Sequence, residues 1–192
     1  MARKRKYPTN AARQAAYRQR MRRSPKAGTV MALIRSSRRD DWETPQVFYH
    51  ELDAEFHFDL DAAASVTNAK CSRYFTKEDN ALEQEWSGRV FLNPPYTAKL
   101  SPAFIKKASE QRNNCEVIVV LIPARTSTKW WRTYVWHDGA PAPGVTLRFP
   151  PRLRNDKPNQ IGKSERRWPF PCAVIIFRPD DCSQPRNLPI SA

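Results

Sequence analysis

The sequence predicts an α/β protein built on a mostly parallel sheet. Three observations predict this fold class. Segments with helical spacing of apolar residues alternate with short apolar runs along most of the chain. The longest apolar run, EVIVVLI at 116–122, is apolar on both faces, which is typical of a central strand covered by helices. Polar side chains follow the ends of successive predicted strands, where open parallel sheets bind their ligands.

The first half of the domain is expected to hold one helix and three strands. Pro45 suits the first turn of a helix that runs to about Glu55, with Thr44 as its N-cap. Period-two alternation and aromatic content indicate the strands that follow. These strands are expected at 56–60, 73–75 and 89–92.

The second half repeats the alternation. Apolar spacing predicts helices at 102–111 and 130–136, on either side of the central strand at 116–122. The last strands are expected at 145–149 and 172–177. The intervening segment 151–168 has six Lys and Arg against two acids and no apolar periodicity, which indicates a long polar loop.

Basic charge is concentrated at the N-terminus. The 192 residues carry a formal net charge of +14, and residues 1–39 hold 13 of the 33 Lys and Arg but none of the 19 Asp and Glu. The domain expected at 40–180 is therefore nearly neutral, and residues 181–192 are expected to be a flexible tail. The basic arm, disordered or helical on a partner, predicts salt-sensitive contact with nucleic acid. A solubilising tail, or translation starting at Met21 or Met31, would explain the same residues.

The sequence shows no sign of membrane insertion or of a metal site. No apolar stretch approaches the roughly 20 residues of a spanning helix, and no secretory signal is visible. The three His and four Cys are scattered without a C-x-x-C pair, so we expect reduced thiols and no metal. The expected location is the cytoplasm.

Asn93-Pro94-Pro95-Tyr96 is the most informative motif. It follows the apolar run at 90–92, and its two prolines end the strand abruptly. The Asn93 side-chain oxygen and the Pro94 carbonyl can accept hydrogen bonds from an exocyclic amine, and Tyr96 can stack on the base that carries it. A proline-rich turn with a Tyr packed in the core is the alternative interpretation.

Asp61, Asp79, Asn93 and Arg125 follow the first four predicted strands. The carboxyl ends of parallel strands lie at one edge of a sheet, so we expect these residues to converge on a single ligand site. The convergence is a stronger signal than any of the four residues alone.

An ordered series of residues resembles the phage N6-adenine DNA methyltransferases, the small Dam-like enzymes of bacteriophages and prophages. The series comprises Asp41-Trp42-x-Thr44-Pro45, Phe56-x-Phe58-x-Leu60-Asp61-x-Ala63-Ala64, Asn80-Ala81-Leu82, Trp86 and Asn93-Pro94-Pro95-Tyr96. The resemblance covers residues 40 to about 178. It implies a Rossmann-like fold that uses S-adenosyl-L-methionine to methylate N6 of a flipped-out adenine in double-stranded DNA.

The resemblance also implies roles for individual residues. Asn93, Pro94, Pro95 and Tyr96 would form the catalytic set. Asp61 would face the amino group of the methyl donor, Thr44 and Pro45 would border its carboxylate, and Asp79 with Asn80 would face its adenine. Ala62 and Ala63 occupy the first cofactor loop, where methyltransferases at large carry glycines; this chain has no glycine at 59–68.

DNA contacts are expected from basic and aromatic residues beyond the fourth strand, because Arg contacts both phosphates and guanine edges. The candidates are Arg125, Lys129, Trp130, Arg148, Arg152, Arg154, Arg166 and Arg167. Without a separate recognition domain, sequence specificity is expected to be short or lax, and a monomer is favoured.

Three alternatives remain open at the level of sequence. One is a non-catalytic, DNA-binding remnant of a methyltransferase, against which the intact tetrad argues. Another is methylation of a different amine: cytosine N4, RNA adenine or a protein glutamine. The third is a metal-dependent nuclease using Asp59, Asp61 and Asp79. The ordered resemblance and the basic arm favour DNA adenine.

Overall fold

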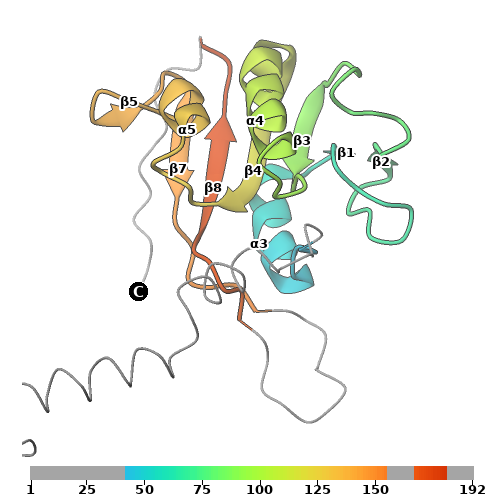
Figure 1. Cartoon of the computed structure of the whole chain (residues 1–192). Coiled ribbons are helices and arrows are strands. Elements are labelled where there is room, and N and C mark those ends of the chain that lie inside the picture. The colour runs from blue at the N-terminus through green and yellow to red at the C-terminus, as the bar shows by residue number, and fades with distance from the viewer. Residues whose placement is uncertain (1–41, 155–166, 181–192) are drawn as a thin grey trace, which may run out of the picture. The chain divides into compact units, whose positions relative to one another are not determined.

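The computed structural model describes residues 42–154 and 167–180. Its main element is a six-stranded mixed sheet (Figure 1). The strand order is β2-β1-β3-β4-β8-β7. The predicted basic arm, the middle of the polar loop and the C-terminal tail lie outside the described residues.

Five of the six strands run in one direction. The strands are β1 (Leu60–Asp61), β2 (Arg73–Tyr74), β3 (Gly88–Leu92), β4 (Cys115–Pro123), β7 (Val145–Arg148) and β8 (Cys172–Phe177). Neighbours among β2, β1, β3 and β4 pair in parallel, and β8 is antiparallel to both β4 and β7. The predicted α/β class with a mostly parallel sheet is confirmed. The reversed strand could not be inferred from an apolar pattern, which carries no direction.

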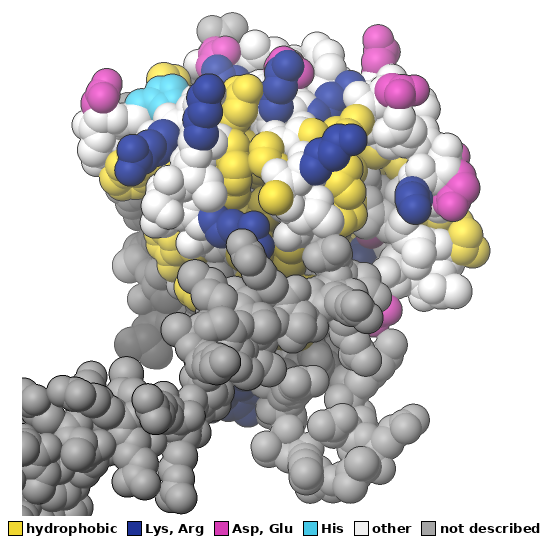
Figure 2. Space-filling model, in the orientation of Figure 1, with side chains coloured by type: hydrophobic (Ala, Val, Ile, Leu, Met, Phe, Trp, Pro, Cys, Tyr) yellow, Lys and Arg dark blue, Asp and Glu magenta, His cyan; other side chains and the backbone are white. Residues whose placement is uncertain are grey.

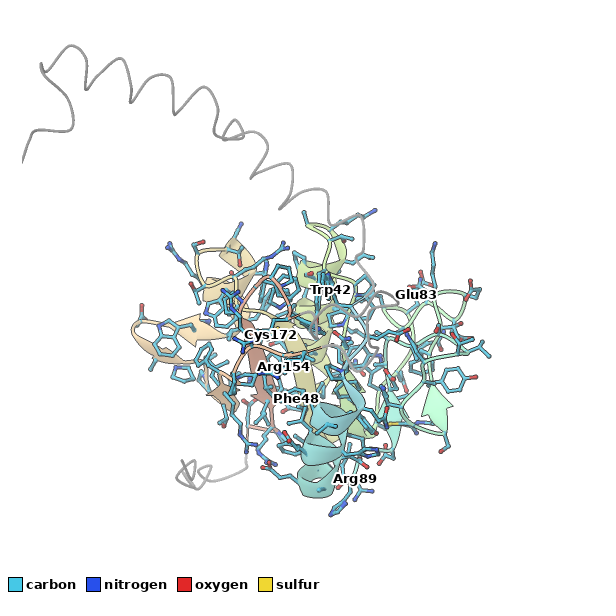
Figure 3. All side chains as sticks on the ribbon, turned by 90° about the horizontal axis from the view of Figure 1, so that it is seen from below. Trp42, Phe48, Glu83, Arg89, Arg154 and Cys172 are labelled. Carbon is cyan, nitrogen blue, oxygen red and sulfur yellow. The ribbon has the colours of Figure 1, made fainter. Side chains whose placement is uncertain are left out.

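Helices cover both faces of the sheet. The helix α3 (Gln46–Phe56) lies on one face, and α4 (Leu100–Gln111) and α5 (Lys129–Tyr134) lie on the other (Figures 1 and 3). A 3-10 turn, η1 (Arg112–Asn114), leads from α4 into β4, and β5 (Trp136–His137) pairs with β6 (Ala140–Pro141) in a separate hairpin. None of the described helices has the length and apolarity needed to span a bilayer.

The core is centred on β4 and β8. All six residues of β8 are buried, and in β4 only Glu116 is exposed. Such runs, apolar on both faces, are typical of strands covered on both sides. At the edge near β2, Trp86 is buried and its indole N–H donates to the Ala81 carbonyl at 2.9 Å. The sheet is therefore a rigid base for the loops that leave its carboxyl edge.

Two details near α3 differ from the sequence-based expectation. Thr44 does not cap the helix: the N-cap position is Pro45, and no side-chain hydrogen bond is made there. The helix also extends to Phe56, where the left-handed His57 (φ 53°) ends it and its N–H bonds to the Asp53 carbonyl. Of the alternating segment at 56–60, only Leu60 belongs to a strand. Phe56 and His57 complete the helix end, and the Asp59 amide donates to the Arg89 carbonyl of β3 at 2.9 Å.

Candidate active site

The candidate site lies at the carboxyl edge of the parallel strands. Asp61 ends β1 and pairs with Phe91 of β3, two residues before Asn93. From β1 the chain crosses to β2 on one side and then to β3 on the other, so these two ends form the switch point where open sheets bind ligands. Figure 3 views the molecule from this edge, and Trp42 and Cys172 both lie there. The backbone of Cys172 pairs with Pro123 at the end of β4.

The side chain of Asn93 is held at both of its polar atoms. Its Nδ2 donates to the Trp42 carbonyl at 2.6 Å, and its Oδ1 accepts from the Tyr96 hydroxyl at 2.6 Å. Because a backbone carbonyl only accepts, the amide must present its NH₂ to Trp42 and its oxygen to Tyr96. Asn93 is half-buried, and an amide oxygen has two lone pairs, so Oδ1 retains one acceptor site.

Tyr96 belongs to a cluster of four rings, Trp42, Tyr96, Trp168 and Phe170, which we call the aromatic cluster. Tyr96 is 6% exposed, and its ring meets Trp168 and Phe170 edge-to-face at 6.1 and 5.7 Å. Trp42 lies 5.4 Å from each of these two rings. Burial raises the pKa of Tyr96 well above its ordinary value, so it remains a neutral donor. In this arrangement the ring is packed rather than open to stack on a base.

The two prolines between Asn93 and Tyr96 shape the bend. Pro94 is buried and Pro95 is half-buried. The Pro95 carbonyl accepts from the hydroxyl of Ser101, a buried residue in the first turn of α4, at 3.2 Å. The bend is thus fixed to the helix that follows it.

Asp61 is a buried carboxylate that organises the loop after β1. It is 3% exposed; its Oδ1 accepts from the Ala63 amide at 3.2 Å and its Oδ2 from the Lys70 amide at 3.1 Å. Burial raises the pKa of Asp61, and the two amide hydrogen bonds oppose that rise. A buried anion held by only two amides would be stabilised further by a cationic ligand group.

Small or unpaired side chains stand at the other positions predicted to face the methyl donor. Ala62 is fully buried, Ala63 is half-buried, and Thr44 and Pro45 are buried on the segment before α3. Among the described residues, the Thr44 hydroxyl is a buried oxygen without a hydrogen-bond partner. Buried polar atoms are normally paired, so this hydroxyl is available to form a hydrogen bond with a bound ligand.

Asp79 and Asn80 are placed in the exposed turn after β2. The Asp79 carboxylate accepts from the Thr76 amide at 2.8 Å and from the Thr76 hydroxyl at 2.7 Å, and these two bonds lower its pKa. Asn80 adopts a left-handed conformation with φ 50°. The structure gives both residues a turn-forming role, which is a weaker basis for a cofactor contact than that of Asp61.

Of the DNA candidates, Arg125 and Lys129 are exposed, and Arg125 reaches the tetrad. The Arg125 guanidinium donates to the Tyr96 carbonyl at 3.4 Å. Arg152, Arg154 and Arg167 are also exposed, with Arg154 and Arg167 joined by an antiparallel bridge, and Arg166 lies outside the described residues.

Two further DNA candidates are engaged by neighbouring residues of the chain. Trp130 is 7% exposed and packs against Trp131, because α5 turns its two Trp toward the sheet, so its ring is not on the surface. Arg148 donates to both Glu55 carboxylate oxygens, at 2.5 and 2.6 Å, and lies over the Phe56 ring at 5.5 Å. This hydrogen bond lowers the Glu55 pKa, so the Arg148 charge already has a partner within the chain.

The three Asp of the nuclease alternative are occupied separately. Asp59 forms ion pairs with Arg73 at 3.8 Å and Arg89 at 3.5 Å, while Asp61 and Asp79 bind backbone amides in different loops. Within residues 42–154 and 167–180, no three His, Cys, Asp or Glu are grouped to hold a metal ion. These three carboxylates therefore lie in separate environments among the described residues.

Comparison with known proteins identifies relatives of this chain. A family model described as DNA N-6-adenine-methyltransferase (Dam) matches residues 32–138. A DNA N-6-adenine-methyltransferase of Haemophilus phage HP1 is 34% identical over 148 residues, which cover 76% of this chain and 82% of that protein. The chain belongs to the DNA N-6-adenine-methyltransferase (Dam) family.

Other relatives of this Dam family chain match over shorter stretches. A DNA N-6-adenine-methyltransferase of Escherichia phage T1 is 40% identical over 96 residues, 48% of this chain and 40% of that protein. The putative methyltransferase YfdM of Escherichia coli K12 is 42% identical over 65 residues, 30% of this chain and 71% of that protein. The chain therefore spans less than half of the T1 protein but most of the HP1 protein.

The Dam match includes the tetrad and Asp61 but ends before β7 and β8. No role was predicted from the sequence for Trp168 and Phe170, which pack against Tyr96, or for the ring of Trp42, which packs against both of them. A signal was available for two of them: Trp168 and Phe170 stand between the basic loop and an apolar strand, where a cluster of aromatic residues indicates packing against a loop.

Proposed function

We propose that this chain transfers a methyl group from S-adenosyl-L-methionine to N6 of adenine in DNA. One observation carries the proposal: the Asn93 amide is fixed at the end of β3 with one free acceptor site on Oδ1, beside the buried Asp61 at the end of β1. Membership of the Dam family supplies the reaction class.

The acceptor amine explains why the site needs hydrogen-bond acceptors rather than a strong base. The lone pair of adenine N6 is delocalised into the ring, so the amine is a poor nucleophile. Hydrogen bonds from its N–H groups to Asn93 Oδ1 and the Pro94 carbonyl would localise that pair on nitrogen. Asn93 is neutral, so it orients and polarises the amine, and the proton lost from N6 passes to solvent after methylation.

The proposed donor, S-adenosyl-L-methionine, matches the chemistry of four residues, Thr44, Asp61, Ala62 and Ala63. S-adenosyl-L-methionine supplies a methyl group bound to a positively charged sulfur. The Asp61 carboxylate suits the amino group of the donor, the unpaired Thr44 hydroxyl suits its carboxylate, and the two alanines permit close approach of its chain. Parallel strands with helices on both faces support the proposed Rossmann-like fold.

Double-stranded DNA is the proposed substrate, with the target adenine extruded from the helix because N6 is unreachable inside a duplex. Figure 2 shows Lys and Arg gathered on the face that carries α4 and α5, with Asp and Glu at its margins. The basic residues of this region include Arg125, Lys129 and Arg132, all exposed. We propose that the chain acts as a monomer on phage or prophage DNA in the bacterial cytoplasm.

A single assay tests the proposal. Purified protein is incubated with methyl-labelled donor and duplex DNA, and the digested nucleosides are separated. Label in N6-methyladenine is the expected result. Label in N4-methylcytosine, label only with an RNA substrate, or tight DNA binding without label would each contradict it in favour of a named alternative.

A further inference from the structure

The Asn93 amide is bound by a residue from a different part of the chain. Trp42 precedes α3 and is 51 positions from Asn93 in sequence, yet its carbonyl accepts from Asn93 Nδ2 at 2.6 Å. The contact is short and uses the one atom of the amide that an aspartate lacks.

The segment that presents this carbonyl is anchored on both sides. The Trp42 ring meets Trp168 and Phe170 at 5.4 Å each, and two positions later Thr44 and Pro45 are buried. A carbonyl held between two packed points cannot easily turn away from its partner. Its position is therefore set by the fold, not by Asn93.

An aspartate at position 93 would fit this arrangement poorly. Its carboxylate would place an oxygen 2.6 Å from the carbonyl oxygen, where two acceptors repel each other and neither is satisfied. The other oxygen would still accept from the Tyr96 hydroxyl. The repulsion is removed if the carboxyl takes up a proton, because its O–H then donates to the carbonyl as the amide did.

We propose that the Trp42 carbonyl selects asparagine over aspartate at position 93 and orients its amide, so that Oδ1 faces the acceptor amine. Trp42 is thus a positioning residue that acts through Asn93. The inference rests on the proposed function for its catalytic readout. It goes beyond that function in assigning the role to a residue outside the tetrad and in explaining why the motif takes its asparagine form in this chain.

Other ionisable groups near Asn93 bear on a pH test. They are the Tyr96 phenol, the Arg125 guanidinium, the Cys172 thiol on β8, Asp61 on the neighbouring strand and Glu43 next to Trp42. All five are present in the wild type and in the variant. Dividing the activity of the variant by that of the wild type at each pH therefore isolates the carboxyl introduced at position 93.

The experiment compares Asn93→Asp with the wild type and with Asn114→Asp. Asn114 is exposed at the opposite end of the sheet, before β4 begins, so it adds the same charge away from the site. At pH 8 we expect kcat for Asn93→Asp to fall about 30-fold, with KM for DNA and affinity for S-adenosylhomocysteine within about threefold of wild type. The ratio to wild type should rise as the pH falls to 5.5. Asn114→Asp should match the wild type throughout.

The outcomes separate this inference from the proposed function. A wild type that methylates adenine, together with an Asn93→Asp variant of near-normal kcat or a pH-independent loss, overturns the inference and leaves the function intact. If the wild type transfers no methyl group, or the variant is unstable, the melting temperatures of the variant and the wild type test the inference instead. The variant should melt several degrees below wild type at pH 8, with a smaller difference at pH 5.5, and an equal difference at both values overturns the inference.

Discussion

At the scale of single residues, Asp61 combines a structural and a proposed catalytic role in one carboxylate. Burial raises its pKa, so the folded state binds a proton more tightly than the unfolded state. Its contribution to stability is therefore greatest below the unfolded pKa of about 3.9 and is lost as the pH rises through the folded value. Burial makes ionisation of Asp61 unfavourable, and a cationic ligand group beside the carboxylate would offset that cost. The ionised carboxylate is therefore expected to favour binding of the donor's amino group.

We predict that Asp61→Asn removes this pH dependence. The free energy of unfolding of the wild type, minus that of the variant at the same pH, should decrease as the pH rises from 4 to 7. Urea unfolding at four pH values measures it, and subtraction cancels the other titrating groups. A difference that grows over this range would mean that the amide hydrogen bonds outweigh burial. Donor affinity should fall in parallel at pH 7, where Asn offers no negative charge.

Tyr96 is the second residue whose environment changes its expected role. Its hydroxyl donates to Asn93 Oδ1 while its ring is packed against Trp168 and Phe170. We predict that Tyr96→Phe lowers kcat about two- to tenfold, the value of one hydrogen bond of about 0.5–1.5 kcal/mol, because Asn93 loses one of its two restraints. The free energy of unfolding should fall by no more than the same value of about 0.5–1.5 kcal/mol, since the ring is retained. Tyr134→Phe, at the end of α5, is the matched control, and equal kcat values for the two variants would contradict the prediction.

At the scale of secondary-structure elements, the start of β3 depends on a close approach by Asp59. Gly88 has φ +77°, and a Cβ there would lie 2.6 and 2.7 Å from the two Asp59 carboxylate oxygens. Asp59 accepts from the Arg89 amide at 3.1 Å and pairs with two arginines, so it is held in place. This close approach lies at the start of the strand that leads into Asn93, where the pairing of β3 with β4 is irregular between Gly88 and Arg89.

We predict that Gly88→Ala destabilises the protein by about 2–4 kcal/mol, from backbone strain plus displacement of Asp59. Gly139→Ala provides the control, because Gly139 has φ +86° but open space around its Cα. That variant should lose only the strain of about 1–2 kcal/mol. Urea unfolding compares the two, and equal losses would show that the Asp59 contact adds nothing.

The elements themselves were largely predictable, whereas the contacts between them were not. The helical spacing of apolar residues at 102–111 and the unbroken apolar run at 116–122 are strong signals. The structure places α4 and β4 over these two segments. The strand predicted at 56–60 was wrong for most of its length, because the end of α3 and the start of β1 share those residues. The Asn93–Trp42 bond joins positions 51 apart, and Trp168 reaches Tyr96 across the sheet, so neither contact leaves a local pattern in the sequence.

At the scale of the whole molecule, charge and catalytic chemistry are separated along the chain. Residues 1–39 carry 13 positive charges and no negative charge, while the remainder of the chain has a net charge of +1. The residues of the candidate site are instead hydrogen-bonded groups held by a buried sheet. We expect affinity for DNA and recognition of the adenine to vary independently, because the positive charge and the candidate site lie in different parts of the sequence.

We predict that the first 39 residues set the salt dependence of DNA binding. In the full-length chain, replacing their Lys and Arg with Gln removes 13 charges and lowers the net charge from +14 to +1. The slope of log K against log salt should become shallower by about 0.9 for each phosphate that the arm no longer neutralises, because fewer counterions are released on binding. Fluorescence anisotropy between 50 and 300 mM salt measures the slope. The double variant Arg125→Gln, Lys129→Gln is the comparison. It should reduce the slope by at most about two, yet raise KM for methyl transfer, because Arg125 contacts the Tyr96 carbonyl of the tetrad and Lys129 begins the helix that follows Arg125. An arm variant with the wild-type slope would mean that the phosphate contacts lie in the domain alone.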